Sequence, residues 1–400
     1  MQYRRFGRTE LSLPVFSCGG MRYQFQWQDT GWDKIPSASQ ENLEAVIATA
    51  WDLGINHIET ARGYGTSEMQ LGRILPRYPR EKLIVQTKVS PHGDRQHFKE
   101  QGEISFGYLN LDYVDLLGIH GINTEELLDY TLRPGGCLEQ ARQWQKEGRV
   151  RWIGFSTHGP TDLICKAIST GEFDYVNLHW YYIFQDNWSA IEAARAQDMG
   201  VFIISPADKG GLLYAPPQKL VTLCEPLSPM VFNDLFCLSH PQVHTLSIGA
   251  SRPSDFQEHL KTLAFLAQPQ QIPELLNPIL ERLSAAFMEA LGEDWARHWR
   301  QGLPSWEQTP GQVNIPTILW LRNLAIAYGM LDYGKMRYNL LGNGGHWFPG
   351  QPAKDIDPQL LQECLQNSPY KEQIPYLLQE TEGLLGGSEV KRLSTTPAPL

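Results

Sequence analysis

The chain has 400 residues, 42% of them hydrophobic, and a formal net charge of -10 from 34 basic and 44 acidic side chains. This acidic balance argues against a nucleic-acid-binding chain, because there is no basic excess to neutralise phosphates. A chain of 400 residues exceeds the usual size of one hydrophobic core, so the sequence predicts one large domain with an appendage, or two domains.

The cysteines and the apolar segments indicate in which cellular compartment the protein is expected. Six scattered cysteines without a C-x-x-C pair argue against a disulfide framework or a closed zinc site, and they fit a reducing compartment. The opening stretch, MQYRRFGRTELS, is basic but has no apolar run behind it, unlike a secretory signal. No stretch of about 20 residues is apolar enough to span a bilayer. The sequence therefore predicts a cytoplasmic protein that binds neither membranes nor nucleic acids.

Short β-rich runs alternate with longer helical stretches through the first two thirds of the chain. Eight runs have the composition of strands, and a helical stretch follows each of them. The runs are residues 13–20, 55–60, 82–89, 113–121, 150–156, 175–180, 200–206 and 243–251. Eight strand–helix repeats predict a closed parallel (β/α)8 barrel, the TIM barrel of the α/β class. An open doubly wound sheet is the alternative, but no G-x-G-x-x-G follows the first strand.

The part of the chain after the eighth repeat has a different character. Residues 267–278, AQPQQIPELLNP, resemble a linker rich in Pro and Gln, and no convincing strand follows them. The predicted domains are therefore a barrel over residues 1–265, a mostly helical extension over 270–385 and a flexible tail over 386–400.

Ionisable side chains fall at the ends of three neighbouring predicted strands. The second strand ends at Glu59, with Tyr64 in the loop behind it, the third ends at Lys88 and the fourth at His120. Each residue alone is more simply a solvated charge or a packed side chain. Because the carboxyl ends of barrel strands meet at one rim, their convergence there indicates a functional site.

Such a set suits proton donation to a carbonyl oxygen. A free Tyr has a pKa of about 10, and an adjacent Lys ammonium favours the phenolate and lowers that pKa. A carboxylate keeps the Lys charged and in place, and a His beside the phenol orients the carbonyl. Protonation of the oxygen is useful when a hydride attacks the carbon, so the set points to hydride transfer.

These residues lie in motifs that resemble those of aldo-keto reductases. The matching stretches are IETARGYG, IVQTK, LDYVDLLGIH, VRWIGFS, IISPADKGGLL and SIGASRPSDFQEHL, in the family's order over about residues 1–265. The resemblance implies NAD(P)H-dependent reduction of an aldehyde or ketone, or the reverse reaction. It implies that Tyr64 is the general acid, Lys88 the modulator of its pKa, His120 the residue that orients the carbonyl, and Glu59 the acid. The family usually has Asp at the position of Glu59, and the added methylene moves the carboxylate.

The resemblance also implies positions for a cofactor. Two residues fall where the family holds the nicotinamide carboxamide, four fall on the diphosphate loop and four in the adenosine segment. These are Ser156 and Asn177, then Ser205, Pro206, Gly210 and Leu212, then Gly249, Ser251, Arg252 and Glu258. An aromatic residue is usual at the position of Ile204, and a cation is common at Asp255, so Arg252 alone would meet a 2′-phosphate. The resemblance thus favours NADP only modestly over NAD, and it implies no metal at the site.

The C-terminal part resembles a subgroup of these reductases that carries a ferredoxin-like extension. The matching stretches are NIPTILWLRNLAIAYGM, KMRYNLLGNGGHWFPG and IPYLLQETEGLL. A [4Fe–4S] cluster needs four thiolates, and residues 270–400 offer only Cys364. The resemblance therefore implies a domain that has kept its fold and lost its Fe–S cluster.

Two other functions stay open. One is a nicotinamide-binding module with weak catalysis, whose C-terminal extension serves as a docking surface for a protein partner. The departures at Glu59 and Ile204 favour it, whereas Tyr64, Lys88 and His120 favour an enzyme with a small carbonyl substrate. The other is an iron-dependent electron-transfer protein, which the cysteine count opposes.

Overall fold

The computed structural model describes residues 1–342, 348–354 and 357–387. The described chain forms two compact units. The first comprises Met1–Gly210 and Asn233–Pro269, and the second comprises Gly211–Phe232 and the described part of Gln270–Thr396. The predicted tail over residues 386–400 lies, from residue 388 onward, outside the described residues.

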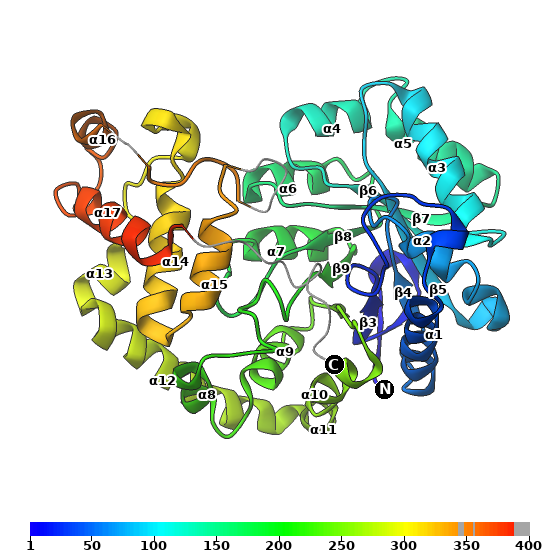
Figure 1. The fold of residues 1–400 in the computed structure, drawn as a ribbon, viewed down its shortest axis with the longest axis horizontal. Coiled ribbons are helices and arrows are strands. Elements are labelled where there is room, and N and C mark those ends of the chain that lie inside the picture. Colours follow the sequence, from blue (N-terminus) through cyan, green and yellow to red (C-terminus); the bar gives the residue numbers. More distant parts are fainter. Residues whose placement is uncertain (343–347, 355–356, 388–400) are drawn as a thin grey trace. The chain divides into compact units, whose positions relative to one another are not determined.

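A closed barrel of eight parallel strands forms the centre of the first unit, with helices around it (Figure 1). The strands pair in the order β10-β3-β4-β5-β6-β7-β8-β9. They are β3 (Phe16–Gly19), β4 (His57–Glu59), β5 (Ile84–Val89), β6 (Val114–His120), β7 (Val150–Ser156), β8 (Tyr175–Leu178), β9 (Gly200–Ile203) and β10 (Thr245–Ile248). Each strand lies within one of the eight predicted runs. The prediction of a (β/α)8 barrel is therefore confirmed, and the open sheet is excluded.

These runs form barrel strands because both of their faces are covered. All six residues of β5 are buried, and β9 and β10 are likewise buried throughout. A strand buried on both faces has a near-continuous apolar run rather than a clean alternation. Parallel neighbours also need a long crossover connection, which the intervening helices supply.

The helices of the first unit follow the strands in the predicted alternation. α1 buries Leu43, Val46, Ile47 and Ala50, which recur at helical spacing along one face. The helices of this unit are α1 (Ser37–Asp52), α2 (Ser67–Leu71), α3 (Arg95–Leu109), α4 (Glu125–Leu132), α5 (Cys137–Lys146), α6 (Thr161–Ser169), α7 (Trp188–Ala196), α10 (Phe256–Leu260) and α11 (Thr262–Leu266). The boundary between the two units falls inside α9 (Pro229–Leu238).

The second unit is helical in the residues that the structure describes. Its helices are α8 (Gln218–Cys224), α12 (Ile272–Leu291), α13 (Glu293–His298), α14 (Ile315–Tyr328), α15 (Leu331–Tyr338), α16 (Pro358–Cys364) and α17 (Ile374–Leu385). α14 contacts α12, α15 and α17, and its side chains Ile318, Leu321 and Leu324 are buried. α17 adds Leu377 and Leu378 to the buried side chains of this unit.

An N-terminal hairpin, which the sequence pattern does not predict, covers the amino ends of the barrel strands. β1 (Tyr3–Arg5) pairs antiparallel with β2 (Ser12–Pro14). Phe6, in the turn between them, is fully buried, and its ring centroid lies 5.7 Å from that of Tyr175. A Cβ on Gly200 would lie 2.6 Å from the Phe6 ring. Tyr175 and Gly200 are the first residues of β8 and β9, so the hairpin lies at the end of the barrel away from the carboxyl rim.

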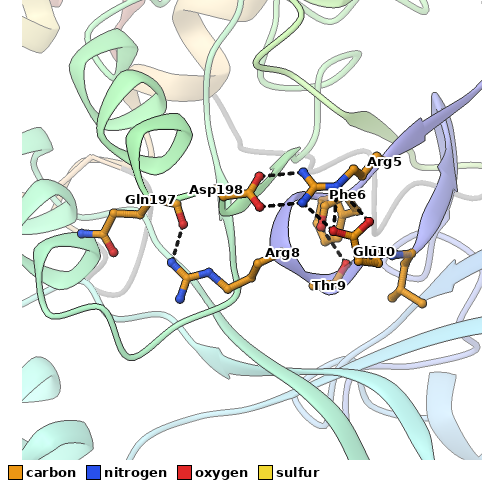
Figure 2. Close-up of polar contacts among 8 residues, drawn as sticks. Arg5, Phe6, Arg8, Thr9, Glu10, Gln197 and Asp198 are labelled. Carbon is orange, nitrogen blue, oxygen red and sulfur yellow. Dashed lines mark hydrogen bonds and ion pairs between the residues drawn. The ribbon is translucent and has the colours of Figure 1, made fainter.

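Charged contacts join the hairpin to the loop before β9 (Figure 2). Arg5 donates from Nη1 and Nη2 to Asp198 at 2.7 and 2.6 Å, and from Nε to Glu10 at 2.9 Å. Arg8 donates to the backbone carbonyl of Gln197. Ion pairs between exposed side chains contribute little to stability, so we expect the buried ring of the hairpin to matter more than its arginines.

Replacing Phe6 with Leu should lower the free energy of unfolding by about 1–3 kcal/mol, because leucine leaves part of the end of the barrel unfilled. Urea unfolding followed by circular dichroism measures the loss. Arg5→Gln is the matched control in the same hairpin and should lose much less stability, since the Arg5 side chain is 51% exposed. Equal losses in the two variants would mean that the ion pairs, and not the ring, hold the hairpin.

Candidate active site

Three consecutive strands place ionisable side chains at one end of the barrel. Glu59 is the last residue of β4, Lys88 is the last but one of β5, and His120 is the last of β6. β4 pairs in parallel with β5, and β5 with β6. The three side chains therefore lie at the carboxyl ends of neighbouring strands, which form the rim of the barrel.

Lys88 makes contacts with two other members of this group. Its Nζ forms an ion pair with Glu59 Oε1 and donates to the carbonyl of Thr60 at 2.7 Å. The ammonium lies 4.8 Å from the centroid of the Tyr64 ring. The Lys88 and Glu59 side chains are only 2% and 4% exposed, so each is the other's main source of charge compensation.

Tyr64 lies in the turn after β4 and completes the group. Its backbone N–H donates to the carbonyl of Ala61 at 3.0 Å, and its side chain is half-buried. The His120 ring meets it edge-on, with 5.7 Å between ring centroids and 84° between ring planes. Trp27, from the loop after β3, makes a second edge-on contact at 6.2 Å. The structure thus brings together Glu59, Tyr64, Lys88 and His120.

The Glu59 side chain, which is one methylene longer than the Asp expected at this position, fits into the structure without displacing its neighbours. A Cβ on Gly19, at the end of β3, would lie 2.3 Å from Ser247 Oγ and 3.3 Å from Glu59 Oε2. A side chain at position 19 would therefore displace its neighbours, whereas glycine leaves them in place. Because Glu59 contacts Lys88, the extra methylene does not separate the pair.

Burial is the main cause of the pKa shifts of Tyr64, Lys88 and His120. It raises the pKa of Tyr64 above its ordinary value and lowers the pKa of Lys88 well below its own. The ion pair with Glu59 favours the charged form of Lys88 and so acts against the second shift. Burial lowers the pKa of His120 to about 3, and the charges of Lys88 and Lys209 add to that effect. At neutral pH Tyr64 is thus a protonated donor and His120 a neutral ring. The sequence predicted a lowered pKa for Tyr64, but desolvation outweighs the lysine charge.

Ser156 and Asn177 continue the rim beyond His120. The strand register pairs His120 with Ser156 and Ser156 with Asn177, so the three residues lie at one level across β6, β7 and β8. Ser156 Oγ accepts a hydrogen bond from the backbone N–H of Gly121 at 3.0 Å. Asn177 is fully buried, and neither atom of its amide has a hydrogen-bond partner among the described residues. A buried amide in this state fits a ligand that carries a complementary amide.

The loop after β9 carries Ser205, Pro206 and Gly210. Ser205 has a φ of 54°, and its carbonyl accepts from the backbone N–H of Lys209 at 2.9 Å. A Cβ on Gly210 would lie 1.9 Å from the Pro206 carbonyl oxygen, so this close approach requires glycine. Leu212, the fourth residue expected on this loop, belongs to the second unit.

In the segment after β10, several side chains contact the carboxylate of Asp255. The residues predicted here are Gly249, Ser251, Arg252 and Glu258. Ser251 and Arg252 both donate to Asp255, and Arg22 from the loop after β3 lies close to the same carboxylate. Glu258 instead pairs with Lys261 at 2.6 Å. The donors of Ser251 and Arg252 are therefore directed at a carboxylate of the chain itself.

A group of side chains that the sequence analysis did not assign lies at the ends of β7, β8 and β9. His158 Nδ1 is 2.5 Å from His179 Nε2, and Lys209 Nζ is 3.2 Å from the same atom. His179 Nδ1 is 2.5 Å from the Tyr181 hydroxyl, which donates to the carbonyl of Ile204. Because a carbonyl can only accept, the Tyr181 oxygen must in turn accept from His179 Nδ1–H. A neutral His179 therefore carries its proton on Nδ1, and the group fixes the carbonyl at the start of the loop after β9.

These residues could have been found by the rule that found His120. His158 and His179 follow β7 and β8 within two residues, and polar residues at such strand ends point toward the rim region. Arg22 has no such signal, because it lies within a long loop rather than at a strand end. Only its tertiary contacts show that it belongs here.

In residues 1–342, 348–354 and 357–387, no group of three or more His, Cys, Asp or Glu side chains is arranged to hold a metal ion. No helix within them is long and apolar enough to cross a membrane.

Comparison with known proteins gives consistent matches. A family model described as the aldo/keto reductase family matches residues 17–219. L-glyceraldehyde 3-phosphate reductase from Escherichia coli (strain K12) is 28% identical over 176 residues, which are 40% of this chain and 46% of that protein. D-threo-aldose 1-dehydrogenase from Pseudomonas sp is 26% identical over 215 residues, 45% of this chain and 64% of that protein. The chain thus spans less than two thirds of the length of these curated relatives.

Solved structures match more of the chain. An aldo-keto reductase from Bacillus halodurans, in its holo form, superposes with a TM-score of 0.57 over 70% of this chain and 96% of that one. The two sequences are 20% identical, so this likeness shows the fold alone.

Proposed function

Because the chain belongs to the aldo/keto reductase family, we propose that it is a nicotinamide-dependent oxidoreductase that reduces an aldehyde or ketone to an alcohol, or catalyses the reverse. The observation that carries this proposal is the meeting of Glu59, Tyr64, Lys88 and His120 at one rim of the barrel. Two relatives are named as a reductase and a dehydrogenase of small sugars or their phosphates, which supports a small carbonyl substrate.

Tyr64 supplies the proton in this proposal. A reduced nicotinamide, when bound, supplies the hydride. Tyr64, like an ordinary phenol, is protonated at neutral pH, so it can donate to the carbonyl oxygen as negative charge develops there. Burial raises the pKa of this phenol and makes the proton harder to release, so the donation depends on a group that stabilises the phenolate. Lys88, whose ammonium lies 4.8 Å from the ring centroid, stabilises the phenolate that remains.

His120 and Glu59 have supporting roles. The neutral His120 ring, edge-on to Tyr64, can hold the carbonyl oxygen beside the phenol with one N–H. Glu59 contacts Lys88 and none of the reacting atoms, so we assign it as a positioning residue. Its carboxylate keeps the ammonium charged and directed toward Tyr64.

The residues present fit a nicotinamide cofactor. The unsatisfied amide of Asn177, together with Ser156, would hold the carboxamide. Of the expected diphosphate contacts, Ser205, Pro206 and Gly210 lie in the first unit, as do the expected adenosine contacts Gly249, Ser251, Arg252 and Glu258. The modest preference for NADPH that the sequence suggested rests on Arg252 alone.

Consumption of NADH or NADPH in the presence of a panel of aldehydes and ketones, followed by absorbance, tests the proposed activity. We expect turnover with at least one small carbonyl compound. Tight cofactor binding without turnover would instead favour the nicotinamide-binding module, with the second unit as its docking surface for a partner.

We also propose that the second unit is a ferredoxin-like extension that holds no cluster. The protein purified without oxygen should contain no stoichiometric iron, because residues 270–400 have one cysteine, Cys364, and a [4Fe–4S] cluster takes four. Metal analysis by mass spectrometry measures the iron, and thermal melting with and without a chelator should coincide. Stoichiometric iron would contradict the proposal and restore an electron-transfer role.

A further inference from the structure

We propose that Asp255 makes this site select NADH over NADPH, because its carboxylate occupies the place that a 2′-phosphate would need. The inference rests on the proposed function, in which the segment after β10 binds the adenosine half of the cofactor. It concerns one residue that none of the comparisons assigns, and it reverses the modest preference for NADP drawn from the sequence.

The Asp255 carboxylate accepts hydrogen bonds on both of its oxygens. Its Oδ2 accepts from the backbone N–H and from the hydroxyl of Ser251, each at 2.9 Å. Its Oδ1 accepts from Nε of Arg252 at 3.1 Å. Arg22 Nη1 lies 3.8 Å from Oδ2, and the Asp255 side chain is only 8% exposed. A backbone N–H, a hydroxyl and guanidinium groups are also the donors that bind phosphate oxygens.

The donors around Asp255 are themselves fixed by the chain. Arg22 donates from Nη1 to the carbonyl of Gly249 at 2.7 Å and from Nη2 to Ser251 Oγ at 3.4 Å. The carbonyl of Ser251 accepts from Asn42 of α1 at 2.7 Å. The group is therefore an anion-binding arrangement, and the anion that it holds is a carboxylate of the protein.

Charge decides which cofactor such an arrangement accepts. A 2′-phosphate carries about −1.5 to −2 charges at neutral pH, and a carboxylate at contact distance repels it. A ribose 2′-hydroxyl carries no charge and can donate a hydrogen bond to the same carboxylate. Acidic residues select the unphosphorylated ribose by this chemistry in dinucleotide-binding domains of another fold.

Arg252 does not restore the preference for NADPH. Its side chain is 47% exposed, but its Nε is bonded to Asp255, which offsets the charge that would attract a phosphate. Removal of the carboxylate charge would remove the repulsion of an incoming 2′-phosphate and weaken the contact that Asp255 makes with this guanidinium and with the Ser251 donors. The preference for NADH should therefore depend on the carboxylate of Asp255.

Titration of the full-length protein with NADH and with NADPH, followed by tryptophan fluorescence, tests the inference. The unmodified protein should bind NADH more tightly. Asp255→Asn keeps the size of the side chain and removes its charge, and it should shift the ratio of the two Kd values toward NADPH by roughly 10- to 100-fold. The double variant Asp255→Asn/Arg252→Ala should lose most of that shift, because the released guanidinium is absent.

Glu192→Gln is the matched control, since this exposed residue of α7 gives the same change in net charge away from the segment. It should leave the ratio of Kd values unchanged. Tighter binding of NADPH by the unmodified protein would overturn the inference while the proposed function stands, and so would equal ratios for the unmodified protein and Asp255→Asn. Binding of neither cofactor would overturn the proposed function, and the inference with it.

Discussion

Replacing Tyr64 with Phe should slow carbonyl reduction by about 10²–10⁴-fold while the Kd for the reduced cofactor stays nearly the same. The hydroxyl is the only group removed, and the contacts of the ring with His120, Trp27 and the Lys88 ammonium can persist in phenylalanine. Single-turnover kinetics with a model aldehyde, together with cofactor titration, separate loss of the chemical step from loss of binding.

Tyr78→Phe is the matched control for this experiment. Tyr78 packs against Trp51, with 5.1 Å between ring centroids, and it precedes β5 rather than following a strand. It loses the same hydroxyl and should turn over as fast as the unmodified protein. If Tyr64→Phe also retained full activity, the phenol would not be the proton donor, and the proposed mechanism would be wrong.

Replacing Lys88 with Met should lower the free energy of unfolding by about 3–5 kcal/mol, because it leaves the Glu59 carboxylate buried without its partner. Methionine is similar in length, so the change removes the charge and the hydrogen bond to Thr60 with little loss of packing volume. Urea unfolding of the folded, cofactor-free protein measures the difference.

The double variant Glu59→Gln/Lys88→Met separates the ion pair from other effects. Removal of both charges should recover a large part of the stability that Lys88→Met loses, since a neutral buried pair has no uncompensated charge. If the double variant were as unstable as the single one, the loss would come from packing. Both variants should lack activity, because neither can stabilise the phenolate.

The barrel could be predicted from the sequence because short β-rich runs recur along the chain and each is followed by a helical stretch. IVQTKV, one of these runs, forms β5 with every residue buried, although Gln86, Thr87 and Lys88 are polar. The N-terminal hairpin escaped prediction because β1 and β2 have three residues each, too few to show a period. We expect Phe6 to stabilise the hairpin, and the ring of Phe6 packs against Tyr175, more than 160 positions away in the sequence.

The site was predictable where strand ends define it and not where loops do. Glu59, Lys88 and His120 follow from strand boundaries, and the chain direction of parallel strands places them together. The contact between Arg22 and Ser251 joins positions 229 residues apart, and no local pattern signals it. The raised pKa of Tyr64 was also missed, because desolvation depends on the packed surroundings and not on which charges are near in sequence.

The hairpin and the proposed chemistry occupy opposite ends of one barrel, and this separation has an evolutionary consequence. Phe6 seals the amino ends of the strands, while the loops that follow β3, β7, β9 and β10 begin at the carboxyl rim. Substitutions in those loops can change which molecules are recognised without weakening the seal, and substitutions in the seal can alter thermal tolerance without changing recognition. Selection can therefore change thermal stability and substrate specificity through separate sets of substitutions.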